Sequence, residues 1–134
     1  DVRSLGLSND DPQALYAHAV AQLAPLRLAF LEVVEGQTAG ARDYAPFDYA
    51  ALRTRFNGAW MVNNGYERQV ALDAVASGAA DLVSFGRPFI GNPDLVRRLR
   101  ESAPLNALDK STLYGGGARG YTDYPTLDAA PVAA

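Results

Sequence analysis

A glycine and an arginine in the second half of the chain follow a short apolar run. The run 81–85 suits a buried strand, and Gly86 and Arg87 turn the chain after it. Residues 92–94, Asn-Pro-Asp, then have the order of a helix start, with a cap, a proline of fixed φ and an acid in the first turn. A glycine backbone lets an anion come close, N–H groups point at it, and a guanidinium can bind two of its oxygens. These residues predict a phosphate site, although an ordinary strand-to-helix connection with a surface arginine has the same pattern.

Other residue types that often do chemistry are scarce. The single histidine, His18, falls on the polar side of a predicted helix, so we expect it to face solvent or to support other residues from a distance. Glu32 lies in a predicted strand and can point into the interior, where a hydrogen-bonded polar residue is a better interpretation than a catalytic one. The chain has no cysteine, which excludes disulfides and thiolate metal sites, and we expect no metal site.

The composition and charge of the chain argue against several classes of function. The 134 residues are 49% hydrophobic, enough for one modest core, and the net charge of −3 argues against a nucleic-acid or anionic-membrane surface. No apolar run approaches the roughly 20 residues needed to span a bilayer. The absence of cysteine suits a reducing compartment, so we expect a cytoplasmic protein. Because residues 1–4 resemble neither a signal peptide nor a translation start, we expect the chain to begin partway through a longer gene product.

Predicted helices and strands alternate along the chain. The predicted helices cover 12–24, 48–56, 67–77 and 93–102, and the predicted strands cover 26–34, 59–64 and 81–85. Alternation of this kind predicts an α/β protein with a parallel sheet and right-handed crossovers. The loop 35–47, between the first predicted strand and the second predicted helix, is long, and long loops in compact domains are often functional.

Apolar spacing predicts which helical residues are buried. The first predicted helix has an apolar stripe, and the second is expected to bury one face. Three residues of the third are expected to face the core, and Gly78 is expected to end that helix. The residues predicted to be buried are Leu15, Tyr16, Ala19, Val20 and Leu23 in the first helix, Tyr49, Leu52 and Phe56 in the second, and Val70, Ala74 and Val75 in the third.

Three parallel strands with their helices are too few to bury both faces of a sheet. An eight-stranded βα barrel needs about 250 residues, so this chain would supply less than half of one. We therefore expect residues 1–128 to form the C-terminal part of one barrel domain, incomplete without strands carried by another chain or fragment. A small self-contained three-layer α/β domain is the alternative.

The end of the chain departs from the alternation. Residues 115–120 contain four glycines and lie between Tyr114 and Tyr121, which suits a loop laid closely over a flat surface or over the barrel wall. Residues 129–134 are expected to be a flexible extension.

Three motifs and two shorter, less specific matches resemble the Old Yellow Enzyme family in the same order along the chain. Residues 85–96, FGRPFIGNPDLV, resemble that family's last barrel strand and the helix after it. Residues 112–117, TLYGGG, and 120–125, GYTDYP, resemble its C-terminal segment, while VVE at 33–35 and NGY at 64–66 match the ends of its sixth and seventh strands. The resemblance covers nearly the whole chain and implies a TIM (β/α)8 barrel of which this chain carries about three strands, the sixth to the eighth.

The resemblance also implies a cofactor and a reaction. Members bind FMN non-covalently and reduce activated C=C bonds of α,β-unsaturated carbonyl or nitro compounds with electrons from NADPH or NADH. Backbone groups of Asn64, Gly65, Gly86 and Arg87 would hold the FMN phosphate, and the Arg87 side chain would add charge. Many relatives have glycine or another small residue where this chain has Asn64.

The rest of the implied site divides between this chain and a companion. The resemblance places Leu113 against the flavin rim and Tyr114 in the substrate pocket. The family's substrate-binding histidine and proton-donating tyrosine belong to upstream strands, so this segment would carry no catalytic residue and would need a companion chain or fragment.

Two other functions stay open at the level of the sequence. One is a non-redox phosphate-binding barrel fragment that acts as an assembly subunit. The other is a phosphate-handling aldolase or isomerase, which the position of the only lysine, Lys110, outside the predicted strands disfavours.

Overall fold

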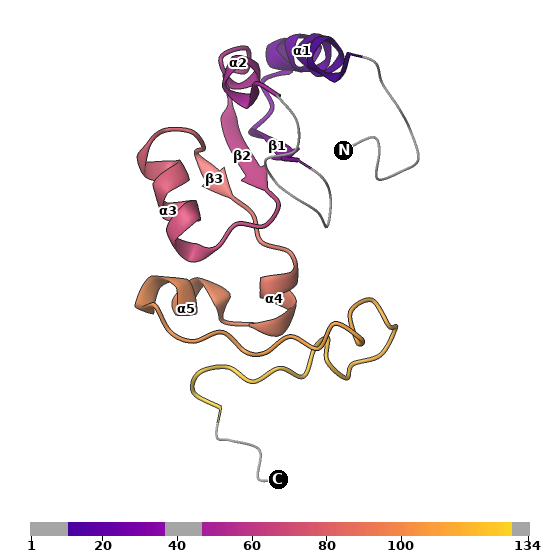
Figure 1. Ribbon diagram of the computed structural model, residues 1–134, viewed down its shortest axis with the longest axis vertical. Helices are drawn as coiled ribbons and strands as arrows, with labels where there is room; N and C mark the ends of the chain where they lie inside the picture. The colour runs from indigo at the N-terminus through magenta and orange to yellow at the C-terminus, as the bar shows by residue number, and fades with distance from the viewer. Residues whose placement is uncertain (1–10, 37–46, 130–134) are drawn as a thin grey trace. The chain divides into compact units, whose positions relative to one another are not determined.

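The computed structural model describes residues 11–36 and 47–129. The chain divides into two compact units, residues 1–84 and residues 85–134, which we describe separately (Figure 1). The N-terminal residues 1–10, most of the predicted loop 35–47 and all but Ala129 of the predicted C-terminal extension lie outside the described residues.

The first unit is built on a parallel sheet of three strands in the order β1-β2-β3. Phe30 of β1 pairs with Ala59 of β2, and Met61 of β2 pairs with Leu82 of β3, so the strands run in the same direction as predicted. The elements of this unit are α1 (Pro12–Leu23), the 3-10 helix η2 (Ala24–Leu26), β1 (Phe30–Val34), α2 (Tyr49–Arg53), β2 (Ala59–Asn63), α3 (Arg68–Ala76) and β3 (Leu82–Val83).

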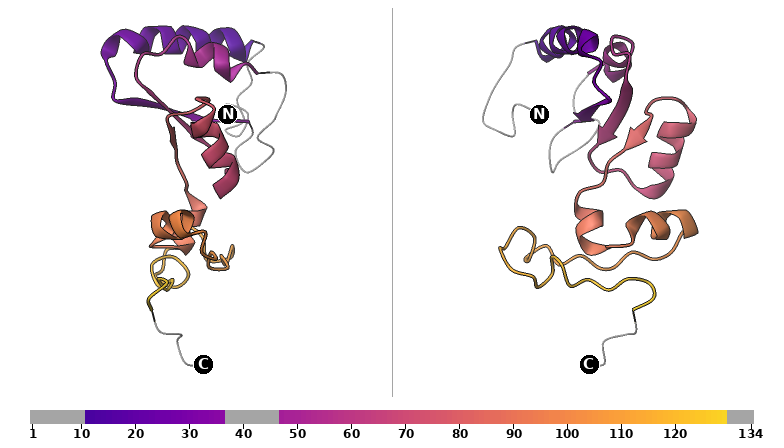
Figure 2. Two further views of the ribbon diagram at one scale, coloured as in Figure 1. Left: turned by 90° about the vertical axis from the view of Figure 1, so that its left-hand side faces the viewer. Right: turned by 180° about the vertical axis from the view of Figure 1, so that it is seen from behind.

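The first two helices begin at aspartate caps and are joined there. Asp11 Oδ1 accepts a hydrogen bond from the Ala14 amide (2.9 Å), and Asp48 Oδ1 accepts one from the Ala51 amide (2.8 Å). The Gln13 side chain donates to the Asp48 carbonyl and accepts from the Asp48 amide, which links the starts of α1 and α2. The two helices lie side by side in the views of Figure 2.

The predicted strand over 26–34 is shorter in the structure. Pro25 lies in η2, and Arg27 after it has a left-handed backbone with φ of 52°. This turn delays the strand to Phe30, which is the first residue of β1 paired with β2. The predicted strand over 81–85 is reduced to Leu82 and Val83, although the amides of Asp81 and Ser84 also bond to carbonyls of β2.

The core of the first unit lies between the sheet and the first two helices. Its buried members are Val20, Leu52, Phe56, Trp60, Val62 and Ala80, which confirms Val20, Leu52 and Phe56 as predicted. Tyr16 packs against this core, and His18 is exposed as expected. Leu15 was predicted to be buried, but it is 42% exposed because the buried side of α1 is centred on Val20.

The buried face of α3 also differs from the prediction. Ala71 is the buried residue, Ala74 packs against the core, and Val70 and Val75 are exposed. Gly78 ends the helix as predicted: it has a φ of 75°, and its amide donates to the Val75 carbonyl.

The second unit contains two short helices followed by a long segment without helix or strand. Its helices are α4 (Arg87–Gly91) and α5 (Leu95–Glu101), whereas the sequence predicted a single helix over 93–102. Asn92 does not cap α5 as predicted, because its side chain donates to the Pro88 carbonyl and accepts from the Asn106 amide. Asp94 occupies the N-cap position instead.

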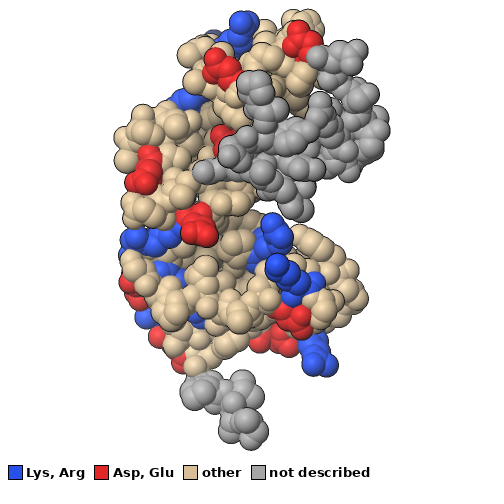
Figure 3. All heavy atoms as spheres, viewed as in Figure 1, with Lys and Arg blue, Asp and Glu red and all other residues tan. Residues whose placement is uncertain are grey.

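Charged side chains are interspersed with uncharged ones on the face shown in Figure 3. None of the helices in the described ranges 11–36 and 47–129 has the length and apolar character needed to cross a membrane.

Candidate functional site

Polar side chains of the first unit gather where its parallel strands end. The Asn63 side-chain amide, at the end of β2, donates to the carbonyl (3.1 Å) and to the hydroxyl (2.7 Å) of Ser84. The Ser84 hydroxyl in turn donates to Glu32 Oε1 at 2.5 Å. Glu32 is therefore hydrogen-bonded as expected, but it is exposed rather than in the interior. The carboxyl ends of parallel strands are where ligands bind in α/β proteins.

The turn after β2 has a left-handed backbone. Asn64 and Gly65 both have positive φ, 96° and 66°. A turn of this kind can direct successive N–H groups toward one anion. An added Cβ at Gly65 would meet nothing within 4 Å, and the Gly65 amide donates to no acceptor among the described residues. The space and the donor that a phosphate needs are therefore present at Gly65.

The Asn64–Gly65 turn is fastened to the end of β1 by Glu35. The Asn64 side-chain amide donates to the Glu35 carbonyl (2.5 Å), and the Tyr66 hydroxyl donates to Glu35 Oε2 (2.6 Å). The Glu35 amide donates to the Asn63 carbonyl at 3.2 Å. The Asn64 side chain therefore stabilises the left-handed turn that its own backbone adopts. Sequence reasoning missed the part played by Glu35 and Tyr66, because it depends on contacts about 30 residues apart in the chain.

Tyr49 supports the same end of β1. Its hydroxyl accepts a hydrogen bond of 2.6 Å from the Gly36 amide. Burial raises the pKa of the Tyr49 phenol, and the hydrogen bond from Gly36 opposes that rise. Tyr49 is therefore neutral near pH 7, and its contact holds the backbone after β1 rather than supplying a charge.

A separate ion pair stabilises the opposite end of the sheet. Arg53 donates two hydrogen bonds to the Asp81 carboxylate, at 2.9 and 3.0 Å, and the Trp60 amide donates to the same carboxylate at 2.7 Å. The Arg53 hydrogen bond is the main reason that the pKa of Asp81 falls to about 2, and the Trp60 amide lowers it further. This pair joins α2 to the starts of β2 and β3 and has a structural role.

Gly86 and Arg87 belong to the second unit. Arg87 begins α4, its side chain is exposed, and it forms no ion pair with any described residue. An added Cβ at Gly86 would meet nothing within 4 Å, and no described acceptor receives the Gly86 amide proton. An open glycine beside an unpaired guanidinium fits the phosphate site predicted from the sequence.

Leu113 and Tyr114 lie in the glycine-rich part of the second unit. Leu113 is half-buried, whereas Tyr114 is 76% exposed and has a left-handed backbone with φ of 61°. The structure thus places two predicted site residues, Asn64 and Gly65, in the first unit and four, Gly86, Arg87, Leu113 and Tyr114, in the second. Lys110 lies outside the helices and strands, as expected.

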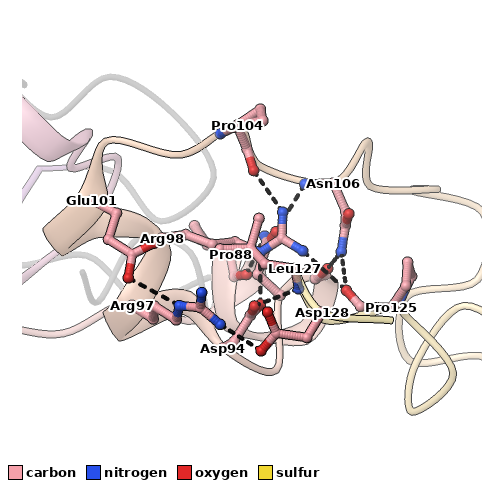
Figure 4. A network of polar contacts seen from close by, with 12 residues as sticks. Pro88, Asp94, Arg97, Arg98, Glu101, Pro104, Asn106, Pro125, Leu127 and Asp128 are labelled. Atoms are coloured by element: carbon pink, nitrogen blue, oxygen red, sulfur yellow. Dashed lines mark hydrogen bonds and ion pairs between the residues drawn. The ribbon is translucent and has the colours of Figure 1, made fainter. Parts of the chain in front are cut away.

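The segment that carries Leu113 and Tyr114 is attached to α5 through a buried arginine that sequence reasoning missed. Arg98 is only 4% exposed, and Figure 4 shows its guanidinium among carbonyl and carboxylate oxygens. It donates to Asp94 Oδ1 (2.6 Å), to the Pro104 carbonyl (2.5 Å) and to the Pro125 carbonyl (3.0 Å). All three acceptors are within the second unit.

Metal chemistry has no visible basis in residues 11–36 and 47–129. No group of three or more His, Cys, Asp or Glu side chains is arranged there to hold a metal ion. Backbone amides and an exposed arginine are groups that can bind an anion.

Comparison with known families gives a match over most of the chain. Residues 11–106 match the model of the NADH:flavin oxidoreductase / NADH oxidase family. The chain is 42% identical to 12-oxophytodienoate reductase 1 of Oryza sativa subsp. japonica, a match that covers 90% of this chain and 29% of that protein. It is 40% identical to the "Probable flavin mononucleotide-dependent alkene reductase" of Leishmania infantum, which covers 90% of this chain and 32% of that protein.

Solved structures give the same result. Morphinone reductase in complex with tetrahydroNAD matches with a TM-score of 0.81 and 38% identity, covering 96% of this chain and 34% of that one. The old yellow enzyme from Trypanosoma cruzi matches with a TM-score of 0.81 and 34% identity, covering 90% of this chain and 31% of that one.

This chain therefore spans about a third of the length of the proteins that it matches. Its parallel three-stranded sheet and these partial matches agree with the predicted α/β fold as part of a larger βα barrel. The resemblance to the Old Yellow Enzyme family is confirmed, and the chain belongs to the NADH:flavin oxidoreductase / NADH oxidase family.

Proposed function

We propose that this chain is the FMN-phosphate-binding part of an ene-reductase that reduces activated C=C bonds of α,β-unsaturated carbonyl or nitro compounds. When bound, FMN would supply the hydride-transfer chemistry that connects NADPH or NADH to the β-carbon of the substrate. The strands β1, β2 and β3 are the sixth, seventh and eighth of the barrel. Matches to a flavin-dependent alkene reductase and to a reductase holding a nicotinamide analogue support the reaction class.

The observation that carries this proposal is the turn after β2. Open space at Gly65 and a Gly65 amide without a described acceptor support phosphate binding at this turn, where Asn64 and Gly65 both have positive φ. Phosphate sites in βα barrels lie after the last two strands, which in this proposal are β2 and β3. Asn64 and Gly65 follow β2, and Gly86 and Arg87 follow β3 in the chain.

The residues of the second unit have two roles in the proposal. The backbones of Gly86 and Arg87 bind phosphate oxygens, and the Arg87 guanidinium adds a charge-assisted hydrogen bond. Leu113 packs on the edge of the flavin, and Tyr114 projects into the substrate pocket, where its exposed phenol can contact the substrate. The groups that bind the electron-withdrawing part of the substrate and supply the proton lie on the missing strands.

A companion chain or fragment carries those strands. Among the described strands, β1 pairs only with β2, so its other edge has unpaired backbone groups. Phe30 and Val34 of β1 are 48% and 39% exposed, and Leu28 just before the strand is 38% exposed. An upstream barrel strand with its helix would cover this edge and these apolar side chains.

A matched pair of glycine variants tests the proposal. Gly65 and Gly78 both have positive φ and open space around an added Cβ, so Gly65→Ala and Gly78→Ala carry a similar backbone penalty, about 1–2 kcal/mol each. Only the Cβ at Gly65 would enter the phosphate space. In the flavin-loaded enzyme, we expect Gly65→Ala to weaken FMN binding in a fluorescence titration and Gly78→Ala to leave it unchanged. Equal FMN dissociation constants for the two variants would contradict the proposal.

The colour of the purified protein distinguishes the ene-reductase from the non-redox alternative. A yellow preparation with flavin absorbance supports the ene-reductase, whereas a colourless protein that binds inorganic phosphate at the same residues supports a phosphate-binding assembly subunit.

A further inference from the structure

The segment 105–124 of the second unit is closed at its base by one side chain. The buried Arg98 donates from Nη1 to the Pro104 carbonyl and from Nη2 to the Pro125 carbonyl, so both ends of the segment meet at a single guanidinium. The Asn106 side-chain amide also donates to the Pro125 carbonyl, at 2.8 Å. Asp94, paired with Arg98 at 2.6 Å, accepts from the Leu127 amide at 2.7 Å. The base of this loop is therefore anchored to α5 from both directions.

Two further cross-links join the opposite sides of the loop above its base. The Asp109 amide donates to the Tyr124 hydroxyl at 2.9 Å. The Thr112 hydroxyl shares its single proton between the Asp109 carbonyl (2.9 Å) and the Gly120 carbonyl (3.1 Å). An added Cβ at Gly120 would lie 2.1 Å from Thr112 Oγ1, so only glycine allows this close approach. Leu113 and Tyr114 follow directly after the last cross-link.

We propose that segment 105–124 is a pre-ordered arm in which Arg98, Tyr124 and Thr112 are positioning residues for Tyr114. This inference rests on the proposed function, in which Tyr114 contacts the substrate. The 76% exposed Tyr114 has little packing of its own, so the cross-links below it hold the backbone from which its side chain projects. A pre-ordered arm contributes to substrate binding because the loop does not lose further conformational entropy when the substrate arrives.

A threonine pair tests the arm in the flavin-loaded enzyme. Thr112→Val keeps the shape of the side chain but removes both hydrogen bonds, whereas the Thr122 hydroxyl reaches only the Ala118 carbonyl at 3.5 Å, so Thr122→Val is the matched control. We expect Thr112→Val to raise the substrate KM roughly three- to tenfold, with a smaller change in kcat and with unchanged flavin content. Thr122→Val should leave all three unchanged.

A double-mutant cycle shows whether Thr112 acts through Tyr114. If it does, Tyr114→Phe changes KM less in the Thr112→Val background than in the parent, because the hydroxyl is already misplaced there. If each substitution changes KM by the same factor whether or not the other is present, the proposal is overturned. An unchanged KM in Thr112→Val would also overturn it. Arg98→Lys, compared with Arg100→Lys on the exposed side of the same helix, repeats the test at the base of the arm, because an ammonium lacks the fork that reaches both carbonyls.

A second measurement separates failure of the arm from failure of the proposed function. If Tyr114→Phe alone leaves KM and kcat unchanged, Tyr114 does not contact the substrate and that part of the proposed function is wrong. Amide hydrogen exchange of residues 109–122 then decides about the arm. Faster exchange in Thr112→Val but not in Thr122→Val supports the pre-ordered arm, and identical exchange in the two variants overturns it.

Discussion

Arg87 is the residue on which the charge of the proposed phosphate site depends. Its guanidinium is exposed and forms no ion pair with the residues that the structure describes. An arginine on the surface of a protein contributes little to stability, but one that binds phosphate forms a charge-assisted hydrogen bond worth about 1.5–3 kcal/mol. A surface arginine and a phosphate-binding arginine therefore differ in their effect on FMN affinity.

We predict that Arg87→Ala lowers the affinity for FMN by roughly ten- to a hundredfold without unfolding the enzyme. Flavin fluorescence titration of the complete enzyme measures this change. Arg100→Ala is the control, because Arg100 is exposed and has no ion pair among the described residues. An unchanged dissociation constant in Arg87→Ala would remove Arg87 from the phosphate site.

At the scale of the elements, the Arg53–Asp81 pair links α2 to the starts of β2 and β3, at the end opposite the proposed site. The pKa of Asp81 is lowered from its ordinary value of 3.8 to about 2 by the Arg53 hydrogen bond and then by the Trp60 amide. Because the folded pKa is below the unfolded one, the ionised carboxylate stabilises the fold fully above about pH 4. That contribution is lost as the pH falls toward about 2.

Asp81→Asn should therefore lower stability at neutral pH and make the acid side of the stability profile flatter. Urea unfolding of the complete enzyme between about pH 2 and 7 measures the difference, which should be constant above about pH 4 and shrink toward about pH 2. Asp73→Asn, on the exposed surface of α3, is the control. A difference that does not change with pH would show that the Asp81 carboxylate acts through shape rather than through its charge.

At the scale of the whole molecule, the chain has a small core and many exposed apolar side chains. Six buried residues form the core of the described part of the first unit, whereas Phe30, Val34 and Leu82 of its sheet are exposed by 48%, 39% and 42%. Each exposed apolar side chain forfeits about 25 cal/mol per Å² of burial, and unpaired strand edges favour aggregation.

We predict that residues 1–134 expressed alone are insoluble or lack a cooperative melting transition, and that they bind no FMN. Co-expression with a fragment that carries the upstream strands should restore a folded, yellow, active enzyme. Gel filtration, thermal melting and FMN titration of both preparations provide the comparison. A monodisperse monomer of this chain with a sharp transition would contradict the dependence on a companion, and turnover by that monomer would place the catalytic residues in this chain.

Local patterns in the sequence were sufficient for several features of this protein. The aspartate before Pro12 and the glycine at 78 act within one helical turn, so the start of α1 and the end of α3 could be predicted from neighbouring residues alone. The alternation of helices and strands predicted a parallel sheet, and the motifs at 85–96 and 112–125 identified the family.

Only the tertiary structure decided which contacts hold the candidate site residues in place. The Asn92 side chain does not cap α5 but bonds to Pro88 and Asn106. Arg98 can be buried because the carbonyls of Pro104 and Pro125 accept its hydrogen bonds. The Asn64 turn likewise depends on Glu35, which lies 29 residues earlier in the chain. A local pattern cannot show such partners, because a buried polar side chain takes whichever acceptor or donor the fold brings within about 3 Å, regardless of its distance along the sequence.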